Sequence, residues 1–555
     1  MTASNGSIAA PAAGLAAFTR LVGVTRAALP LLLGAVAACG FQPLALWPLT
    51  LLAVAGFVEL VSRARTGRAA FLAGWLFGVG HFTLGNNWIA AAFAYQAQMP
   101  AWLGMIAVVL LSLYLAVFPA LATLAAWLFA RWRRPGCSEG SGRFGLVLAF
   151  AAFWIVTEWM RAWVFTGFAW NPLGVVLLGG FDRQGLALLA PWIGTYGLSG
   201  VAVLVAGLLH FAVRQAWYGT GARRHLAGIA LLVAAATLGL LMIRPAGYLA
   251  REEGRRAFTL IQPDLRQETL NEPALYEPNF VKMARLTTPR RPDSTRVVFW
   301  PESGLVDYLR DGYPRYLYRA LTYEGDPVLA RERIGRVIGP YSLLLTGAVD
   351  VVLKNDDEVA ALNSVTAIDY EGHIFAGYSK AHLVPYGEYL PMRHLLEPIG
   401  LSRLVAGTLD FRAGPGPRTY DFGRWGEAGI QICYEIVFSG EVVDPRNRPD
   451  YIFNPSNDGW FGRWGPPQHL AQARLRAIEE GLPVLRSTTT GISAVVDADG
   501  IVRAHLPWRT AGRIDGRIPP PHEPTLFARL GNRAPLALAV ALLVLSAVAS
   551  RRRSR

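Results

Sequence analysis

Lysine is nearly absent from this chain of 555 residues. It occurs only as Lys282, Lys354 and Lys380, although lysine and arginine together number 53. Arginine therefore supplies almost every generic positive charge. Because a compact ammonium and a planar guanidinium are not interchangeable at a tight site, each remaining lysine is a candidate for a specific role.

Cysteine is scarce as well. Cys39 lies in an apolar run, Cys137 in an arginine-rich loop and Cys433 in the more polar middle of the chain. A single cysteine in that middle segment excludes a disulfide framework within it. The sequence also has no Walker or dinucleotide-binding loop, and its nine histidines form no credible metal cluster, so no cofactor is expected.

The charge and the apolar residues are distributed unevenly along the chain. A net charge of +14 would suit a nucleic-acid binder, but much of the excess arginine flanks apolar runs, as membrane topology requires. No nucleic-acid partner is therefore expected. The 53% of hydrophobic residues, with 17 tryptophans, is concentrated in roughly the first 243 residues and the last 20, which indicates a membrane protein with a soluble middle.

Eight apolar runs are long enough, or nearly so, to cross about 30 Å of hydrocarbon. The first is interpreted as an uncleaved helix rather than a signal peptide, because several further spans follow it. We expect a membrane domain over 1–243 with seven transmembrane helices, a soluble domain over 244–533, and a last transmembrane helix with a basic tail over 534–555. The eight runs lie at about 25–41, 45–62, 70–92, 102–131, 144–164, 187–213, 225–243 and 534–550.

The connections between the apolar runs alternate in charge. The connections at 63–68, 131–143 and 214–224 are rich in arginine, whereas 93–101 has no charge and 165–186 carries only Asp182 and Arg183. An excess of arginine marks cytoplasmic loops. Parity then places both termini in the cytoplasm and the segment 244–533 in the periplasm. Arginines near both ends agree with this: Arg20, Arg26, Arg551, Arg552 and Arg553.

A few polar residues lie inside the apolar runs. Glu158 and Arg161 are spaced to pair at i,i+3, and interhelical hydrogen bonding is the simpler interpretation of the group. The alternative is that these residues shape a lateral opening for a lipid headgroup, since ionisable groups are costly at membrane depth. The other members of the group are His81, Asn86, Asn87 and His210.

The middle segment alternates short apolar runs with helical or loop stretches, which predicts an α/β sandwich. A helix is expected after Gly465-Pro466-Pro467, with Leu470, Ala473, Ala477 and Leu482 on its buried face and Glu479 and Glu480 facing solvent. The expected strands are 258–262, 297–300, 343–349, 365–368, 429–433, 451–453, 484–486 and 492–497.

Three reactive side chains follow apolar strands. Glu302 comes after 297–301, Lys380 after 375–379 and Cys433 after 429–432, and strand ends are where α/β folds collect their active sites. A free thiol has a pKa of about 8.5, so a nucleophilic cysteine needs a base and a nearby positive charge. A carboxylate supplies the base, and an ammonium stabilises the thiolate and an oxyanion. A lone cysteine is more often a small buried residue, but the motifs around these residues favour a triad.

Those motifs resemble the apolipoprotein N-acyltransferase family. Glutamate, lysine and cysteine are shared by the whole nitrilase (carbon-nitrogen hydrolase) superfamily, whereas the long lysine motif, the Cys-Tyr-Glu triplet and the fused membrane domain resemble the acyltransferase in particular. The resemblance covers almost the whole chain. Its motifs are WPES at 300–303, YSKAHLVPYGEYLP at 378–391, CYE at 433–435, SNDGWFG at 456–462 and the pair Gln468-His469, with EWMR at 158–161 and GFAWN at 167–171 in the membrane part.

The resemblance implies a bacterial inner-membrane enzyme with a periplasmic nitrilase-like αββα sandwich. Cys433 would take an acyl chain from a phospholipid as a thioester and pass it to the α-amino group of a diacylglyceryl-cysteine on an apolipoprotein. Glu302 would be the base, and Lys380 would stabilise the oxyanions. Supporting and substrate-loop roles would fall to Glu388, Tyr434, Glu435, Trp460 and Phe461.

Simpler interpretations stay open for these supporting residues. They are a surface salt bridge for Glu388, a purely structural turn for Tyr434 and Glu435, and ordinary loop packing for Trp460 and Phe461. The chain also departs from the family where relatives read Gln-Gly-Asn, at Pro263 and Asp264, and where they carry an asparagine, at Thr489. These departures bear on substrate contacts rather than on the triad.

Two other functions use the same sequence features. A membrane-tethered nitrilase or amidase would have the same triad, but it would need no eight spans and should stay active as the soluble segment 244–533. A non-catalytic membrane scaffold or transporter would use that segment as a docking module, and the intact set of Glu302, Lys380 and Cys433 counts against it.

Overall fold

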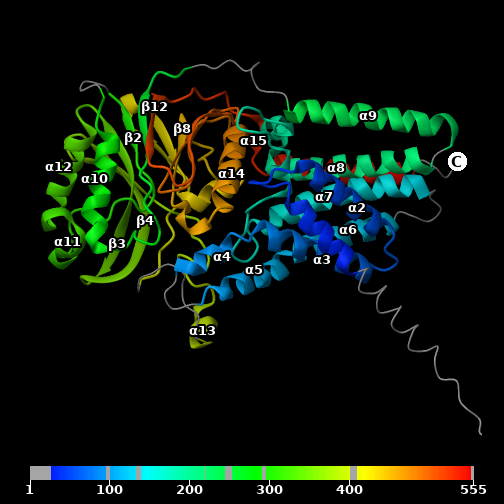
Figure 1. The fold of residues 1–555 in the computed structure, drawn as a ribbon, viewed down its shortest axis with the longest axis horizontal. Coiled ribbons are helices and arrows are strands. Elements are labelled where there is room, and N and C mark those ends of the chain that lie inside the picture. Colours follow the sequence, from blue (N-terminus) through cyan, green and yellow to red (C-terminus); the bar gives the residue numbers. More distant parts are fainter. Residues whose placement is uncertain are drawn as a thin grey trace, which may run out of the picture.

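The computed structural model describes residues 27–95, 100–132, 139–218, 220–243, 253–290, 295–399 and 409–551. A bundle of apolar helices occupies one end of the molecule and a domain of two sheets the other (Figure 1). Five residues named above lie outside the described residues: Arg20, Arg26, Cys137, Arg552 and Arg553. The expected domain boundary at 243–244 falls at the end of a described range.

The bundle confirms the predicted apolar helices in the N-terminal part of the chain. Within the described ranges, four helical stretches are long and apolar enough to cross a membrane: Trp102–Trp132, Phe144–Arg161, Leu186–Tyr218 and Arg224–Ile243. The exact number of spans stays a prediction, because the other helices are shorter or less apolar. The helices are Ala27–Ala38, α2 (Trp47–Ser62), α3 (Gly67–Gly85), α4 (Ile89–Ala92), α5 (Trp102–Leu115), α6 (Val117–Trp132), α7 (Glu139–Arg161), α8 (Ala190–Tyr218), α9 (Gly221–Ile243) and, from the C-terminal end, α16 (Arg533–Arg551).

The second domain consists of two six-stranded sheets packed face to face, as predicted for an α/β sandwich. In order across the first sheet lie β12 (Gly512–Arg517), β1 (Ala257–Gln262), β2 (Val297–Phe299), β3 (Leu343–Lys354), β4 (Asp357–Asp369) and β5 (Ile374–Ser379). Across the second lie β11 (Val502–Leu506), β10 (Ser493–Val496), β9 (Val484–Thr488), β8 (Tyr451–Ser456), β7 (Glu427–Ile430) and β6 (Thr419–Asp421).

Helices cover the outer faces of both sheets and complete an αββα sandwich. The helices α10 (Tyr276–Thr287), α11 (Arg315–Leu321) and α12 (Pro327–Ile338) lie on the side far from the bundle, whereas α14 (Gly465–Glu480) and α15 (Leu526–Leu530) lie between the second sheet and the bundle (Figure 1). The parallel strands β1–β2–β3 and β7–β8–β9 are thus covered on both faces, which explains why their sequences are continuous apolar runs rather than alternating ones.

Helix α14 corrects one expectation. It includes the Gly465-Pro466-Pro467 expected to precede it and ends before Leu482, and Glu479 and Glu480 are 0% and 5% exposed instead of facing solvent. The second face of the helix meets the membrane domain rather than water. Glu479 is therefore paired: its Oε1 accepts from the Thr195 N–H of α8 at 2.5 Å, and its Oε2 lies 2.6 Å from Arg476 Nε.

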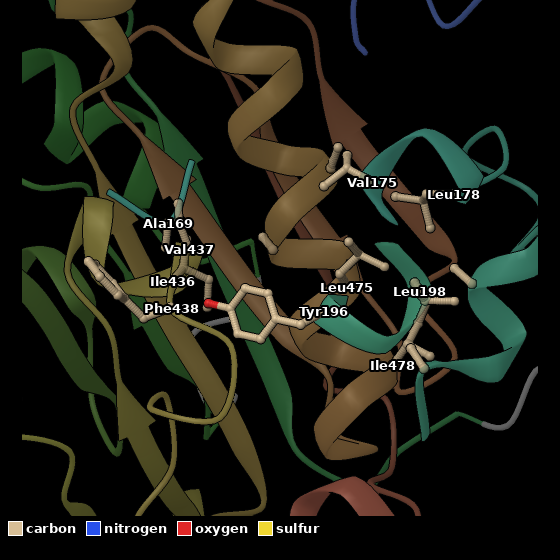
Figure 2. Close-up of a cluster of buried hydrophobic side chains, with 14 of the residues drawn as sticks. Ala169, Val175, Leu178, Tyr196, Leu198, Ile436, Val437, Phe438, Leu475 and Ile478 are labelled. Atoms are coloured by element: carbon tan, nitrogen blue, oxygen red, sulfur yellow. The ribbon is translucent and has the colours of Figure 1, made fainter. Parts of the chain in front are cut away.

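The two domains share one hydrophobic core across this contact. Val175, Leu178, Tyr196 and Leu198 of the membrane domain lie close to a second set of buried side chains (Figure 2). Those belong to the segment after β7 and to α14: Ile436, Val437, Phe438, Leu475 and Ile478. The sheet that carries Cys433 is thereby fixed against the membrane helices.

Candidate functional site

The three predicted reactive residues come together where the two sheets meet. Glu302 follows β2 and Lys380 follows β5 of the first sheet, while Cys433 follows β7 of the second and begins the 3-10 helix η8 (Cys433–Val437). All three are buried, with exposures of 5%, 1% and 5%. Lys380 Nζ lies 3.8 Å from Glu302 Oε1. The arrangement joins a thiol, a carboxylate and an ammonium in one water-poor site.

The Cys433 thiol is neutral at rest. Burial and the negative charge of Glu302 raise its pKa well above the ordinary value, although Lys380 opposes this. Its backbone φ of +51° is in the left-handed region, which a non-glycine residue adopts at a cost and which is frequent at functional sites. With its pKa raised in this way, the thiol would need a base that takes its proton before it could act as a nucleophile.

Two hydrogen bonds hold the Glu302 carboxylate in place. Asn363 Nδ2 donates to its Oε1 at 2.7 Å, and the Asn457 N–H donates to its Oε2 at 2.7 Å. Burial raises the pKa of Glu302, while the positive charge of Lys380 lowers it. The neighbouring strand approaches so closely that a Cβ on Gly347 would lie 2.7 Å from the Glu302 Cα, so only glycine fits there.

Glu388 lies beside Lys380 and is 6% exposed, so it is no surface salt bridge. Its Oε1 is 3.0 Å from Lys380 Nζ and accepts from Asn363 Nδ2 at 2.9 Å, while its Oε2 accepts from the Val384 N–H at 2.7 Å. Burial would lower the pKa of Lys380, but the charges of Glu388 and Glu302 outweigh it and raise that pKa. The lysine is therefore an ammonium.

Glu435 accepts hydrogen bonds both from the segment that carries Lys380 and from the turn that begins at Cys433. Its Oε1 accepts from Tyr378 Oη at 2.7 Å, the Ala381 N–H at 2.7 Å and the His382 N–H at 3.2 Å, and its Oε2 accepts from the Ile432 N–H at 2.7 Å. These contacts join the segment that carries Lys380 to the turn that begins at Cys433. Its neighbour Tyr434 stacks on Trp170 of the membrane domain at 6.4 Å between ring centroids.

The polar residues of α7 hold the loop that carries Trp170. Arg161 Nη1 donates to the carbonyls of Phe168 and Trp170 at 2.7 and 2.9 Å, and Glu158 Oε1 accepts from the Leu173 N–H at 2.8 Å. The expected Glu158–Arg161 pair is long, at 3.9 Å. The two residues thus anchor a loop, and Glu158 also hydrogen-bonds Ser199 of the helix α8, which is an interhelical contact. His210 makes another, at 2.7 Å to Glu59.

The two substrate-loop candidates lie in η9 (Asp458–Phe461), which packs on the membrane domain. Phe461 is buried, with its ring 4.7 Å from that of Trp88 and 5.6 Å from that of Trp170. Trp460 is partly buried and contacts Tyr95 at 5.8 Å. This loop therefore connects the site to the segment after α3.

Sequence reasoning missed Asn363, which bridges Glu302 and Glu388. The only sign of it was a polar residue inside a strand. The departures from the family pattern also prove close to the site: Thr489 Oγ1 donates to Asn457 Oδ1 at 2.8 Å, and Asp264 Oδ1 accepts from Thr490 Oγ1 at 2.6 Å. Thr489 thus acts on Glu302 through one intervening residue, Asn457.

Within the described ranges, one group has a spacing that would suit a metal ion, in contrast to the expectation of no cluster: Asp369, Glu371 and His373. It lies in the turn between β4 and β5, where Asp369 Oδ1 accepts from the backbone N–H groups of the other two at 2.9 and 2.8 Å. Two of its three members are exposed. Turn geometry alone accounts for the cluster, and it gives no evidence of a cofactor.

Residues 33–208 match the family model of the apolipoprotein N-acyltransferase N-terminal domain, and residues 265–522 match that of carbon-nitrogen hydrolase. The chain is 35% identical over 551 residues to the apolipoprotein N-acyltransferase of Bradyrhizobium diazoefficiens, which covers 95% of this chain and 96% of that protein. For the Rhodopseudomonas palustris enzyme of the same name, the identity is 32% over 541 residues, covering 94% and 95%. Among solved structures, an amidase from Nesterenkonia sp. aligns at 17% identity and a TM-score of 0.30, over 49% of this chain and 93% of that one. The chain therefore belongs to the apolipoprotein N-acyltransferase family and is an acyltransferase.

Proposed function

We propose that the protein transfers an acyl chain from a membrane phospholipid, through a thioester on Cys433, to the α-amino group of the N-terminal diacylglyceryl-cysteine of apolipoproteins. The observation that supports this most is the burial of Glu302, Lys380 and Cys433 together at the junction of the sheets. The loop η9 connects that junction to the membrane helices, where a lipid donor would be found.

In the first half of the reaction, Cys433 Sγ attacks the ester carbonyl carbon of the phospholipid while Glu302 takes the thiol proton. The oxyanion that forms is stabilised by the Lys380 ammonium. The intermediate collapses by breaking the bond to the glycerol oxygen, which leaves with the proton from Glu302. The products are a thioester and a lysophospholipid, and the ester itself supplies the activation.

In the second half, the free α-amine of the lipoprotein attacks the thioester carbonyl. Glu302 accepts a proton from the amine, Lys380 again stabilises the oxyanion, and the Cys433 thiolate leaves and takes up that proton. The acyl chain ends in an amide, and the enzyme returns to its starting state. One thiol that serves a lipid first and a bulky peptide second implies a ping-pong order.

The proposed setting is a bacterial inner membrane, with residues 1–243 and 534–555 in or beside the bilayer and the catalytic domain 244–533 in the periplasm. The alternating arginine-rich connections support this orientation. Reporter fusions at Gly136 and Gly516 should report opposite sides of the membrane. The same side at both positions would contradict the topology.

The chemistry is tested by giving the full chain a phospholipid with a labelled acyl chain and no acceptor. A labelled adduct should accumulate on Cys433, should be cleaved by neutral hydroxylamine, and should disappear when a diacylglyceryl peptide with a free α-amine is added. Cys433→Ala should abolish the adduct, and Glu302→Gln should slow its formation because an amide cannot accept the thiol proton.

Cys39 offers a matched control, because it is a free cysteine in the membrane part. Cys39→Ala should leave both the adduct and the transfer unchanged. Normal transfer by Cys433→Ala, or an adduct on another residue, would overturn the mechanism. Release of the label as free fatty acid, with none on the peptide, would instead identify a hydrolase.

A further inference from the structure

A polar cluster that the triad does not use lies directly behind Cys433. It consists of Asp458 in η9, His469 in α14 and Arg486 in β9, and the side chains of all three are 0% exposed. Buried ionisable groups are costly unless each is paired and hydrogen-bonded. Their contacts therefore indicate what the cluster holds in place.

His469 connects the cluster to the backbone of the nucleophile. Its Nε2 lies 3.0 Å from the Cys433 carbonyl oxygen. A carbonyl oxygen only accepts hydrogen bonds, so Nε2 carries a proton and donates it. Burial and the charge of Arg486 lower the pKa of His469, whereas Asp458 raises it. The other ring nitrogen, Nδ1, lies 2.9 Å from Asp458 Oδ1 and 2.9 Å from Arg486 Nη2.

The histidine ring is held from several sides. Arg486 Nη2 donates to both carboxylate oxygens of Asp458 at 2.8 Å, which fixes the guanidinium. The ring of Trp170, from the membrane domain, lies 5.1 Å from that of His469, and the ring of Phe461 lies 5.8 Å away. Rotation of the imidazole away from the Cys433 carbonyl would break these contacts together.

The position of the Cys433 carbonyl determines the direction in which the Tyr434 N–H points. The Cys433 carbonyl and the Tyr434 N–H belong to one planar trans peptide and point in opposite directions. Asn454 Nδ2 also lies 3.5 Å from the carbonyl, but it donates to the Gln431 carbonyl at 2.6 Å, so His469 is the main donor.

We propose that His469 is a positioning residue, whose Nε2–H holds the Cys433–Tyr434 peptide in the orientation that acyl attack at Cys433 requires. His469 touches no substrate and acts through this peptide alone. The inference rests on the proposed acyl chemistry at Cys433. It also gives the membrane domain a part in catalysis, because Trp170 holds the histidine ring.

A matched pair of variants of the full chain separates positioning from bulk structure. In His469→Gln, the amide nitrogen replaces Nε2 and still reaches the Cys433 carbonyl, whereas in His469→Asn it replaces Nδ1 and falls short. His469→Asn would leave the Tyr434 N–H free to turn away from the acyl oxyanion, so we expect it to lower the rate of thioester formation by on the order of 100-fold, the usual effect of losing an oxyanion donor. His469→Gln should recover most of that loss, and KM for the phospholipid should be unchanged in both.

The rate at which iodoacetamide alkylates Cys433 distinguishes positioning from a general structural defect, because such a defect would change this rate. Iodide is displaced at a saturated carbon, so the reaction depends on the thiol but forms no oxyanion. Both variants should be alkylated at the rate of the parent chain. His505→Gln, at an exposed histidine of β11, is the control and should change neither rate.

Equal thioester rates for the Gln and Asn variants, or alkylation that falls in proportion to acylation, would overturn the inference. If His469→Asn does not fold, the result for His469→Gln decides. A folded His469→Gln protein that forms thioester as poorly as Cys433→Ala overturns the inference. A rate of thioester formation close to that of the parent chain supports it. If the parent chain transfers acyl groups without any thioester, the proposed intermediate fails, and the same comparison is made on kcat for transfer to the peptide amine.

Discussion

Lys380 makes its closer ion pair with Glu388, at 3.0 Å between Nζ and Oε1, rather than with the triad glutamate 3.8 Å away. The lysine is 1% exposed in a chain that has only three lysines, so we expect the site to require a compact ammonium. We expect Lys380→Arg to lower kcat by at least about 100-fold although the charge is kept, because a guanidinium is too broad for an oxyanion site of this size.

The chain offers a matched control for this variant. Lys354 lies at the exposed end of β3, and Lys354→Arg should leave the acyl-transfer rate unchanged. Both variants are compared by their initial rates of transfer to a diacylglyceryl peptide at saturating phospholipid. Near-normal turnover of Lys380→Arg would show that the site needs only a positive charge.

The pH dependence of activity should follow the carboxyl group of Glu302. Burial raises its pKa, Lys380 lowers it, and Glu388 raises it. A base is active when deprotonated, so kcat/KM should fall as the pH drops through this pKa, at a pH above the ordinary carboxyl range. Glu388→Gln removes a negative charge that favours protonation, so the acid limb of its profile should move to lower pH.

Glu371, an exposed carboxylate in the turn between β4 and β5, provides the comparison. Glu371→Gln should give the parent profile. The measurement is kcat/KM for the labelled phospholipid across the acid range, with each variant checked for folding at every pH. An acid limb that stays in place or moves upward in Glu388→Gln would argue against Glu302 as the base.

The sequence located the reactive residues because each stands in a local motif at the end of a strand. Glu302, Lys380 and Cys433 could therefore be placed before any contact was known. Asn363 could not, since its role depends on the pairing of β4 with β5 and on the approach of two distant glutamates. A single polar residue in a strand carries no information about what lies across from it.

The error on α14 has a similar origin. The spacing of its apolar residues gave one buried face correctly, and the same logic placed Glu479 and Glu480 in water. Amphipathicity describes a helix with one packed side, whereas this helix is packed on both. Glu479, Arg474 and Arg476 have partners in the membrane domain, and such partners are visible only once the two domains are placed together.

Glu435 should contribute to stability as well as to activity. Its carboxylate accepts four hydrogen bonds from buried or half-buried donors, including the Tyr378 hydroxyl and the Ile432 N–H. In Glu435→Gln, one oxygen becomes an NH₂ group that faces a donor. An unpaired buried donor costs about 1–3 kcal/mol, so the melting midpoint in detergent should fall measurably.

Glu441 gives a control at a half-exposed position, where its Oε2 lies 3.1 Å from His382 Nε2. Such exposed pairs contribute about 0–1 kcal/mol, and Glu441→Gln should shift the midpoint little. Equal shifts in the two variants would show that the contacts of Glu435 do not hold the turn of the cysteine.

The catalytic domain should depend on the membrane domain for activity, even toward a substrate that needs no membrane. A fragment of residues 253–530 would lose Trp170 from above His469, and it would expose the apolar faces of Leu475, Ile478 and Phe461. We expect the fragment to bind a hydrophobic dye. We also expect it to react with a short-chain soluble ester at least about 100-fold more slowly than the full chain, since the Tyr434 N–H would lose its support as an oxyanion donor.

The burst of acyl-Cys433 in the two proteins is the measurement, with circular dichroism to confirm that the fragment retains its sheets. A folded fragment with the burst rate of the full chain would show that the sandwich is self-sufficient, as a tethered amidase would be, and that the membrane helices serve only to bring the lipid.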